Sequence, residues 1–303
     1  MNINQNLQPT LRSTFRAAYN RYIAKRRMMV SNLYMENTID TLESEDYWLG
    51  DIPEGMKRWV TARTYEALAT FKQGLKSVAW TTPGWRYNRA ENAGTNVQQL
   101  TERMGRTIAQ TDDLIDEFCV KLLVNGQEAT ALAYDEAPFF DDGTNRSFSN
   151  VLAGKGVTAS NLESDIGDVM ELYANMRTDK GNKIEIKPNN ILCSLPLYLK
   201  FAKILKSPTT SDQANANVIN ILREFGLTID WTHKLSGNTW YMMTNDLGMR
   251  PTYWQTTRIQ GSRVILDVDE THLASEGWYG IAASLYGIGD YGLPFTCVRV
   301  NNA

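Results

Sequence analysis

The clearest element in the sequence is residues 97–124, VQQLTERMGRTIAQTDDLIDEFCVKLLV. Its apolar residues recur at helical spacing and therefore share one face of an α-helix. Thr95 with Gln98 three residues later is typical of a capped start, and Asn125-Gly126 is typical of a stop. Such a helix is roughly 40 Å long, which predicts the spine of a domain. The apolar series is Val97, Leu100, Met104, Ile108, Ile115, Phe118 or Cys119, and Leu122.

Downstream of this helix, strand-type and helix-type segments alternate without an internal repeat. The order predicts an α+β fold with a mixed or antiparallel sheet. Helices are expected at 160–178, 196–206 and 218–225, and strands at 184–186, 191–193, 227–232, 239–243, 252–258, 264–268 and within 279–300.

Upstream, the charges separate along the chain. Residues 1–34 contain six Lys or Arg and no acid, whereas residues 36–54 contain seven acids and no Lys or Arg. Such a bipolar arm suits a position across neighbouring subunits or on an internal polyanion; a solvated helix followed by an acidic loop is the simpler interpretation. A packed turn and short helix are expected over 47–68. Residues 70–92 predict a long hairpin around Pro83-Gly84, flanked by Lys72, Lys76, Arg86 and Arg89.

Composition narrows the class of protein. The 303 residues carry a net charge of −3 and are 43% hydrophobic, which is sufficient for a folded core and gives no overall field for nucleic acid. Cys119, Cys193 and Cys297 are isolated in apolar stretches and predict buried, reduced thiols. No signal peptide or membrane-spanning stretch is apparent, so we expect a protein made and kept in a cytoplasm.

An enzymatic function is not supported by the motifs. Residues 287–292 match G-x-G-x-x-G, but a strand-like segment follows where a dinucleotide site needs a helix, so a Gly-rich bend between strands is expected. His233 and His272 are the only histidines, in separate polar segments. We therefore predict no catalytic, cofactor-binding or metal site.

The spine helix carries a set of like charges. Asp112 with Asp116, and Asp113 with Glu117, are spaced i,i+4, where like charges repel. A basic hairpin from a neighbouring subunit lying over this face would relieve that repulsion. A solvated acidic face is the alternative.

Several short motifs resemble a known family. They are Tyr47-Trp48-Leu49-Gly50-Asp51-Ile52-Pro53 with Arg58-Trp59 and Arg63, then Leu132-Ala133-Tyr134-Asp135 and Phe139-Phe140-Asp141. Over roughly residues 45–145 the chain resembles the Mu-like prophage major head subunit family. It departs from that pattern at Asp142-Gly143-Thr144-Asn145, where family members tend to carry His-Pro. The order of elements resembles the tailed-phage and herpesvirus major capsid fold, called Hong Kong 97-like.

The resemblance implies a division of the chain and a function. The implied parts are an N-terminal arm (1–46), the packed turn (47–68), an extended loop (69–92), a peripheral domain (93–184), an axial domain (185–275) and return strands (276–303). The implied function is that of a major capsid protein assembling into hexamers and pentamers of an icosahedral shell. Expected intersubunit contacts are Arg12, Arg16, Arg21, Lys72, Lys76, Trp80, Trp85, Arg86, Asp112, Asp113, Asp116 and Glu117.

The implied partners are other copies of the chain, a separate scaffold protein, a portal, and packaged DNA at the inner face, with no membrane. The virion capsid is the expected location, after assembly in the host cytoplasm. Three alternatives remain open at this point: an encapsulin-like compartment shell, a nucleic-acid-binding protein acting through the basic arm, and a nucleotide-dependent enzyme using the Gly-rich tail.

Overall fold

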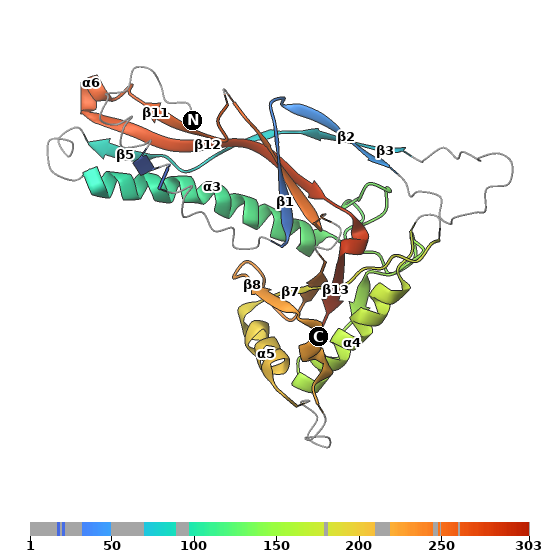
Figure 1. The fold of residues 1–303 in the computed structure, drawn as a ribbon. Coiled ribbons are helices and arrows are strands. Elements are labelled where there is room, and N and C mark those ends of the chain that lie inside the picture. Colours follow the sequence, from blue (N-terminus) through green and yellow to red (C-terminus); the bar gives the residue numbers. More distant parts are fainter. Residues whose placement is uncertain are drawn as a thin grey trace.

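The chain folds into two lobes (Figure 1). A computed structural model describes residues 17–18, 20–21, 32–49, 70–88, 97–178, 181–209, 219–244, 248, 250–259 and 261–302. We call the six-stranded sheet packed on the long helix the spine lobe, and the five-stranded sheet covered by two helices the compact lobe. Both sheets mix parallel and antiparallel pairs, which confirms the predicted α+β class.

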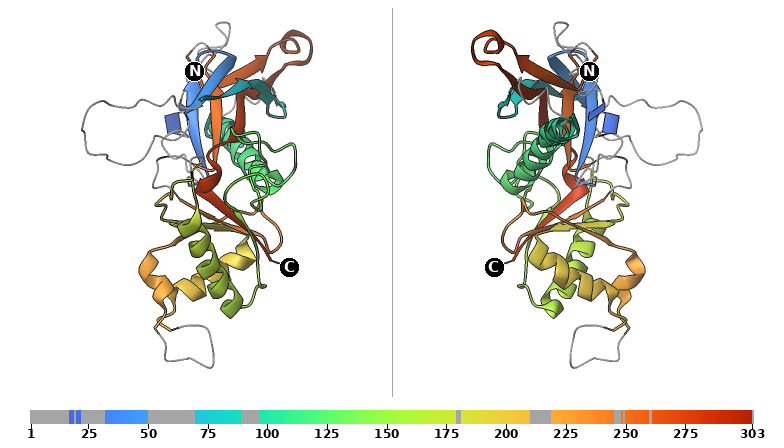
Figure 2. Two further views of the ribbon diagram at one scale, coloured as in Figure 1. Left: turned by 90° about the vertical axis from the view of Figure 1, so that its right-hand side faces the viewer. Right: turned by 90° about the vertical axis from the view of Figure 1, so that its left-hand side faces the viewer.

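Helix α3 (Val97–Asn125) confirms the predicted spine. Its buried residues follow the predicted spacing, from Leu100 and Met104 to Ile115 and Cys119. The helix lies against β12 (Trp278–Tyr291) and β10 (Thr252–Thr257), and the side views in Figure 2 show it on one face of these strands. The cap predicted at Thr95 lies outside the described residues.

Strand β12 organises the spine lobe because it has neighbours along both edges. Leu285 pairs with Val264 of β11 (Val264–Asp269) and also with Trp80 of β4 (Val78–Thr81). Since one residue has one partner on each side, β11 and β10 share one edge, and β4 and β5 (Trp85–Asn88) share the other. Strand β1 (Tyr34–Ile39) adds to β10 in parallel.

The prediction of a hairpin around Pro83-Gly84 is wrong. Strands β4 and β5 do not pair with each other; they follow one another along the same edge of β12. Between them Thr82 stays in register, because its N–H donates to the Ala283 carbonyl and its hydroxyl accepts from the Ala283 N–H. Pro83 and Gly84 therefore interrupt one long strand without reversing it.

A two-stranded ladder lies just upstream. Strand β2 (Glu43–Leu49) pairs antiparallel with β3 (Thr70–Lys76), from Glu43 opposite Lys76 to Leu49 opposite Thr70. In Figure 1 the ladder projects to the right of the spine lobe. A packed turn and short helix were predicted over residues 47–68. Residues 47–49 form the end of strand β2 instead, and residues 50–68 lie outside the described part of the chain.

The compact lobe has the strand order β6 (Val151–Ala153), β13 (Cys297–Asn301), β9 (Trp240–Met243), β7 (Asn190–Cys193) and β8 (Thr228–Trp231). Helices α4 (Ala159–Asn175) and α5 (Leu195–Lys206) pack on it through a separate hydrophobic core. Short helices within the described parts of the two lobes are η2 (Ile221–Phe225), α6 (Leu273–Glu276) and η3 (Pro294–Thr296).

The structure groups several segments differently from the sequence-based division. Helix α4 was expected in a peripheral domain ending at 184, but it packs on the compact-lobe sheet. Residues 252–275 were expected in the axial domain, but they supply β10 and β11 of the spine lobe. The strand predicted at 184–186 is absent, because residues 184–189 are irregular, and the helix predicted at 218–225 is the 3₁₀ helix η2.

The Gly-rich tract lies inside strand β12, not in a bend. A Cβ at Gly287 would lie 2.6 Å from the Gln255 carbonyl oxygen and 2.8 Å from the Trp254 ring, and one at Gly289 would lie 2.9 Å from Phe118. These glycines allow close packing of β12 on its neighbours. The strand runs on to η3 and β13, with no helix N-terminus for a pyrophosphate, so the tract has a packing role.

We predict opposite effects of two Gly→Ala substitutions. Gly287→Ala should lower the free energy of unfolding by about 1–3 kcal/mol, because the new methyl group would overpack the contact of β12 with Trp254 and Gln255 of β10. Gly105→Ala, at an α3 position with open space, should raise it by up to about 1 kcal/mol. Urea unfolding monitored by circular dichroism measures both, and equal effects would contradict the packing role.

Candidate functional site

The acidic set on the spine helix divides into a buried and an exposed half. Asp112 and Asp116 are 7% and 3% exposed, whereas Asp113 and Glu117 face solvent. The two buried carboxylates bond within the subunit: Asp116 accepts from the Tyr34 hydroxyl at 2.9 Å and Asp112 from Arg263 at 2.7 Å. The expectation of an intersubunit role is therefore not supported for Asp112 and Asp116, which instead hold β1 and the sheet to α3.

Arg263 is the centre of this buried network. Its Nε donates to Glu36 at 2.6 Å, while Glu36 also accepts from the Thr256 hydroxyl. Burial raises the pKa of Asp112, although the Arg263 charge opposes this. Burial alone would lower the pKa of Arg263, but the charges of Glu36 and Asp112 outweigh it, so its pKa is raised and it stays protonated. Part of the predicted acidic arm is thus folded into the spine lobe.

The other predicted contact residues occupy several settings. Lys72 and Lys76 form exposed ion pairs with Glu45 at 2.7 Å and Glu43 at 3.0 Å across the β2–β3 ladder. Arg86 lies over the Trp278 ring, 4.5 Å from its centroid. Trp80 and Trp85 are half-buried and donate to the Gly287 carbonyl and to Thr107; Arg21 is exposed, and Arg12 and Arg16 lie outside the described residues.

A groove of about 280 Å³ opens beside the exposed half of the acidic set. Trp80, Leu114 and Leu285 line it with apolar surface, and the carboxylates of Asp113 and Glu117 border it. The break between β4 and β5 at 82–84 borders this groove, which places an apolar surface beside two exposed carboxylates.

A cluster of exposed apolar residues lies on the compact lobe, and the sequence analysis missed it. Six of the ten large hydrophobic side chains exposed among the described residues belong to α5, η2, β8 and the residues just before η2. The signal was present in α5, where outward Leu195 and Leu199 accompany inward Leu197 and Phe201, so that the helix is apolar on more than one face. We name the six residues the α5 patch: Leu195, Leu199, Ile219, Ile221, Phe225 and Trp231.

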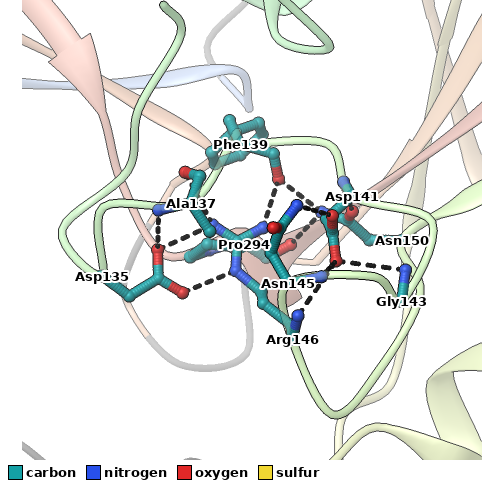
Figure 3. Close-up of polar contacts among 9 residues, drawn as sticks. All are labelled: Asp135, Ala137, Phe139, Asp141, Gly143, Asn145, Arg146, Asn150 and Pro294. Atoms are coloured by element: carbon teal, nitrogen blue, oxygen red, sulfur yellow. Dashed lines mark hydrogen bonds and ion pairs between the residues drawn. The ribbon is translucent and has the colours of Figure 1, made fainter. Parts of the chain in front are cut away.

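The loop between α3 and β6 contains two linked polar clusters (Figure 3). Arg146 pairs with Asp135 through Nε at 2.6 Å and Nη2 at 2.8 Å, and its Nη1 donates to the Phe139 carbonyl. Asn150 joins the loop to the start of η3 by donating to the carbonyls of Phe139 and Pro294. This network fixes the link between the lobes.

Asp141 forms the second cluster in Figure 3. Its carboxylate accepts from the backbone N–H groups of Gly143, Asn145 and Arg146 and from the Asn145 side chain. Residues 142–145, where the sequence departs from the family pattern, therefore wrap around this carboxylate. Burial raises the pKa of Asp141, but these hydrogen bonds outweigh it and hold the pKa below its ordinary value of 3.8.

Clusters of metal-ligating side chains are absent from the described part of the chain. No group of three or more His, Cys, Asp or Glu residues there is placed to hold a metal ion. The three cysteines are free and buried, and burial raises the pKa of the Cys193 thiol to about 12, as expected of unreactive core thiols. None of the helices in these residues combines the length and apolar composition needed to cross a bilayer.

Family models match the sequence over most of its length. One described as phage capsid protein matches residues 89–290, and one described as Mu-like prophage major head subunit gpT matches residues 8–169. Each covers more than half of the chain. A search of curated protein sequences gives no significant match.

Solved structures share the fold at low sequence identity. The capsid of the cyanophage P-SCSP1u is 11% identical with a TM-score of 0.56, covering 90% of this chain and 87% of that one. Microbacterium phage Oxtober96 is 11% identical with a TM-score of 0.56, covering 91% and 90%. A virus-like particle from Pyrococcus furiosus is 13% identical with a TM-score of 0.54, covering 95% and 98%.

The two-lobe arrangement around a spine helix is the Hong Kong 97-like fold. The match of residues 89–290 to the phage capsid protein model defines the class as that of phage capsid proteins. More narrowly, the chain belongs to the family of the Mu-like prophage major head subunit gpT, a family of phage capsid proteins. The family match confirms the resemblance seen in the sequence. The fold also occurs in the archaeal virus-like particle, so the family match is what favours a phage head over the compartment-shell alternative.

We predict that Asp141→Asn lowers the free energy of unfolding by about 1–3 kcal/mol at pH 7, because an amide nitrogen replaces an oxygen that accepts backbone N–H groups. A carboxyl group whose pKa is lower in the folded than in the unfolded state stabilises the fold at any pH above its unfolded-state pKa. This stabilisation is lost as the pH falls through its folded-state pKa. The difference from the unmodified protein should therefore shrink below about pH 3.8. Urea titrations across pH measure this, with exposed Asp142→Asn as control; a pH-independent difference would exclude the ionised carboxylate as the cause.

Proposed function

We propose that copies of this capsid protein associate into hexamers and pentamers through the α5 patch. The patch is the observation that carries the proposal, because soluble proteins rarely leave several large apolar side chains exposed together unless another surface covers them. Ile219 and Ile221 are 72% and 67% exposed and Leu199 is 58% exposed. In a closed ring, the neighbouring subunit covers these side chains in every copy. Each added subunit therefore removes a further apolar area from water and stabilises the ring.

The contact is heterologous: the patch of one copy meets a different surface of the next. A head-to-tail contact closes into a ring when the rotation per subunit divides a full turn, so one subunit can serve rings of five and six with a small change of angle. The compact lobe then lies nearest the ring axis and takes the place of the axial domain, while the spine lobe takes that of the peripheral domain.

We predict that Leu199→Glu combined with Ile221→Glu abolishes assembly and leaves the fold intact, because both side chains are mostly exposed in the subunit. Negative-stain microscopy and mass photometry measure the assembly, and circular dichroism checks the fold. Glu171→Lys, an exposed change on the other helix of the lobe, is the control. Normal shells from the double variant would remove the α5 patch from the contact.

A second contact is proposed at the groove bordered by Asp113 and Glu117, which receives a basic segment of the ladder from a neighbouring copy. The side chains of Lys72 and Lys76 are more than half exposed and form ion pairs with exposed Glu45 and Glu43 of their own ladder. Exposed ion pairs contribute little to stability, about 0–1 kcal/mol, so exchanging partners on assembly costs little. In this proposal the β2–β3 ladder is part of the extended loop, which was expected at residues 69–92.

We predict that Asp113→Lys reduces the yield of shells severalfold, because it places like charges at this contact, while the unfolding free energy changes by less than about 0.5 kcal/mol at an exposed position. Sedimentation of assembled particles measures the yield. Asp142→Lys, an exposed carboxylate on the loop that wraps Asp141, is the control. An unchanged yield for Asp113→Lys would mean that this groove is not the docking position.

The remaining parts of the proposal follow the family. A scaffold protein and a portal assist assembly in the host cytoplasm, packaged DNA meets the inner face, and the basic residues of the N-terminal arm serve contacts between subunits or with DNA. The protein acts by association and catalyses no reaction, which is supported by its membership of a structural family and by the packing role of residues 287–292.

A further inference from the structure

A groove of about 430 Å³ lies where the two lobes meet. One wall is the C-terminal half of α3, and the other is the loop from β8 to β9 together with β13. Its lining is rich in donors of hydrogen bonds and contains a single carboxylate. The lining residues are Glu117, Val120, Lys121, Val124, His233, Lys234, Leu235, Ser236, Thr239, Tyr241 and Arg299.

Lys234 is the most enclosed cation of this groove. Its side chain is 12% exposed, and its Nζ donates to the backbone carbonyl of Asp113 at 2.7 Å. The nearest carboxylate, that of Glu117, is 4.0 Å from Nζ, beyond hydrogen-bonding distance. An ammonium carries three donors, so a largely desolvated Lys234 retains donors for a further acceptor in the groove.

Arg299 and Lys121 add two more cations. Arg299 uses Nη1 on the Val124 carbonyl at 2.8 Å and Nε on Asn301, which leaves Nη2 with no hydrogen-bond partner in the described part of the chain. Lys121 pairs with Glu117 at 2.6 Å but is 68% exposed and can turn toward a ligand. Three cations against one carboxylate give the lining a net charge of +2 without counting His233.

The loop that carries Lys234 is fixed in place. Thr232 donates its N–H to the Cys193 carbonyl, and its hydroxyl accepts from the Lys234 N–H. Ser194, at the start of α5, donates its hydroxyl to the Gly237 carbonyl. The donors are therefore preorganised, so binding an anion there costs little ordering of the loop.

We infer that this groove binds a phosphate group. A phosphate presents more acceptor oxygens than a carboxylate, and it matches a lining that offers an ammonium, a guanidinium, the Ser236 and Thr239 hydroxyls and the His233 ring. Free phosphate and the backbone of DNA both supply this chemistry. The inference goes beyond the proposed association of subunits, because the groove shares no residue with the α5 patch and only Glu117 with the groove beside Asp113.

The test is titration calorimetry of sodium phosphate into the purified full-length chain, against sodium chloride at the same ionic strength. Phosphate should bind with a heat that chloride does not give. Lys234→Met should weaken binding about tenfold or more, because it removes a charged hydrogen bond and keeps the length of the side chain. Lys200→Met is the matched control, since Lys200 also donates to a backbone carbonyl, that of Val157, but lies on α5 outside the groove.

The outcomes separate cleanly. The inference would be overturned if phosphate gave no binding heat at matched ionic strength. It would also be overturned if phosphate bound Lys234→Met as strongly as the unmodified protein. If Lys234→Met fails to fold, the exposed Lys121→Met replaces it and should weaken binding severalfold. Competition by a short DNA duplex identifies the DNA backbone as the source, whereas phosphate binding without competition identifies free phosphate. Since the measurement needs no assembly, failure of the α5 patch to drive ring formation leaves it unaffected.

Discussion

Strand β12 has to hydrogen-bond to strands along both of its edges and also lie against the spine helix. One edge carries β11 and β10, and the other carries β5 and β4. Its residues alternate between buried and half-buried, and its glycines let Trp254 and Phe118 approach. The position of β1 depends in turn on β10, and the Arg263 network joins that edge to α3. The spine lobe is therefore one cooperative unit centred on a single strand.

Much of this architecture was visible in the sequence. The helix at 97–124 was predicted within a residue of its observed end because its apolar spacing is unbroken over many turns. The buried position of Asp112 and Asp116 was also accessible: they continue the i,i+4 series from Met104 and Ile108 to Val120, all of them buried. What the sequence could not supply was their partner, since Arg263 lies 151 residues from Asp112.

The errors arose where tertiary pairing overrode local signals. Pro83-Gly84 is a strong turn signal, yet β12 offers an edge that both β4 and β5 can join, so the chain stays extended. The assignment of α4 to the wrong lobe has the same origin, because helix amphipathicity shows that a face is buried and not against which sheet. The proposed contact surfaces, the α5 patch and the two grooves, are formed by residues distant in sequence, and only α5, which is apolar on more than one face, carries a local signal.

The position of β12 and β13 near the C-terminal end of the chain governs when the fold can form during synthesis. Strand β13 lies between β6 and β9, and β12 lies at the centre of the other sheet. Neither sheet can close before residues 278–301 have left the ribosome. An incomplete product that lacks these two strands therefore cannot present the rigid lobes that association requires.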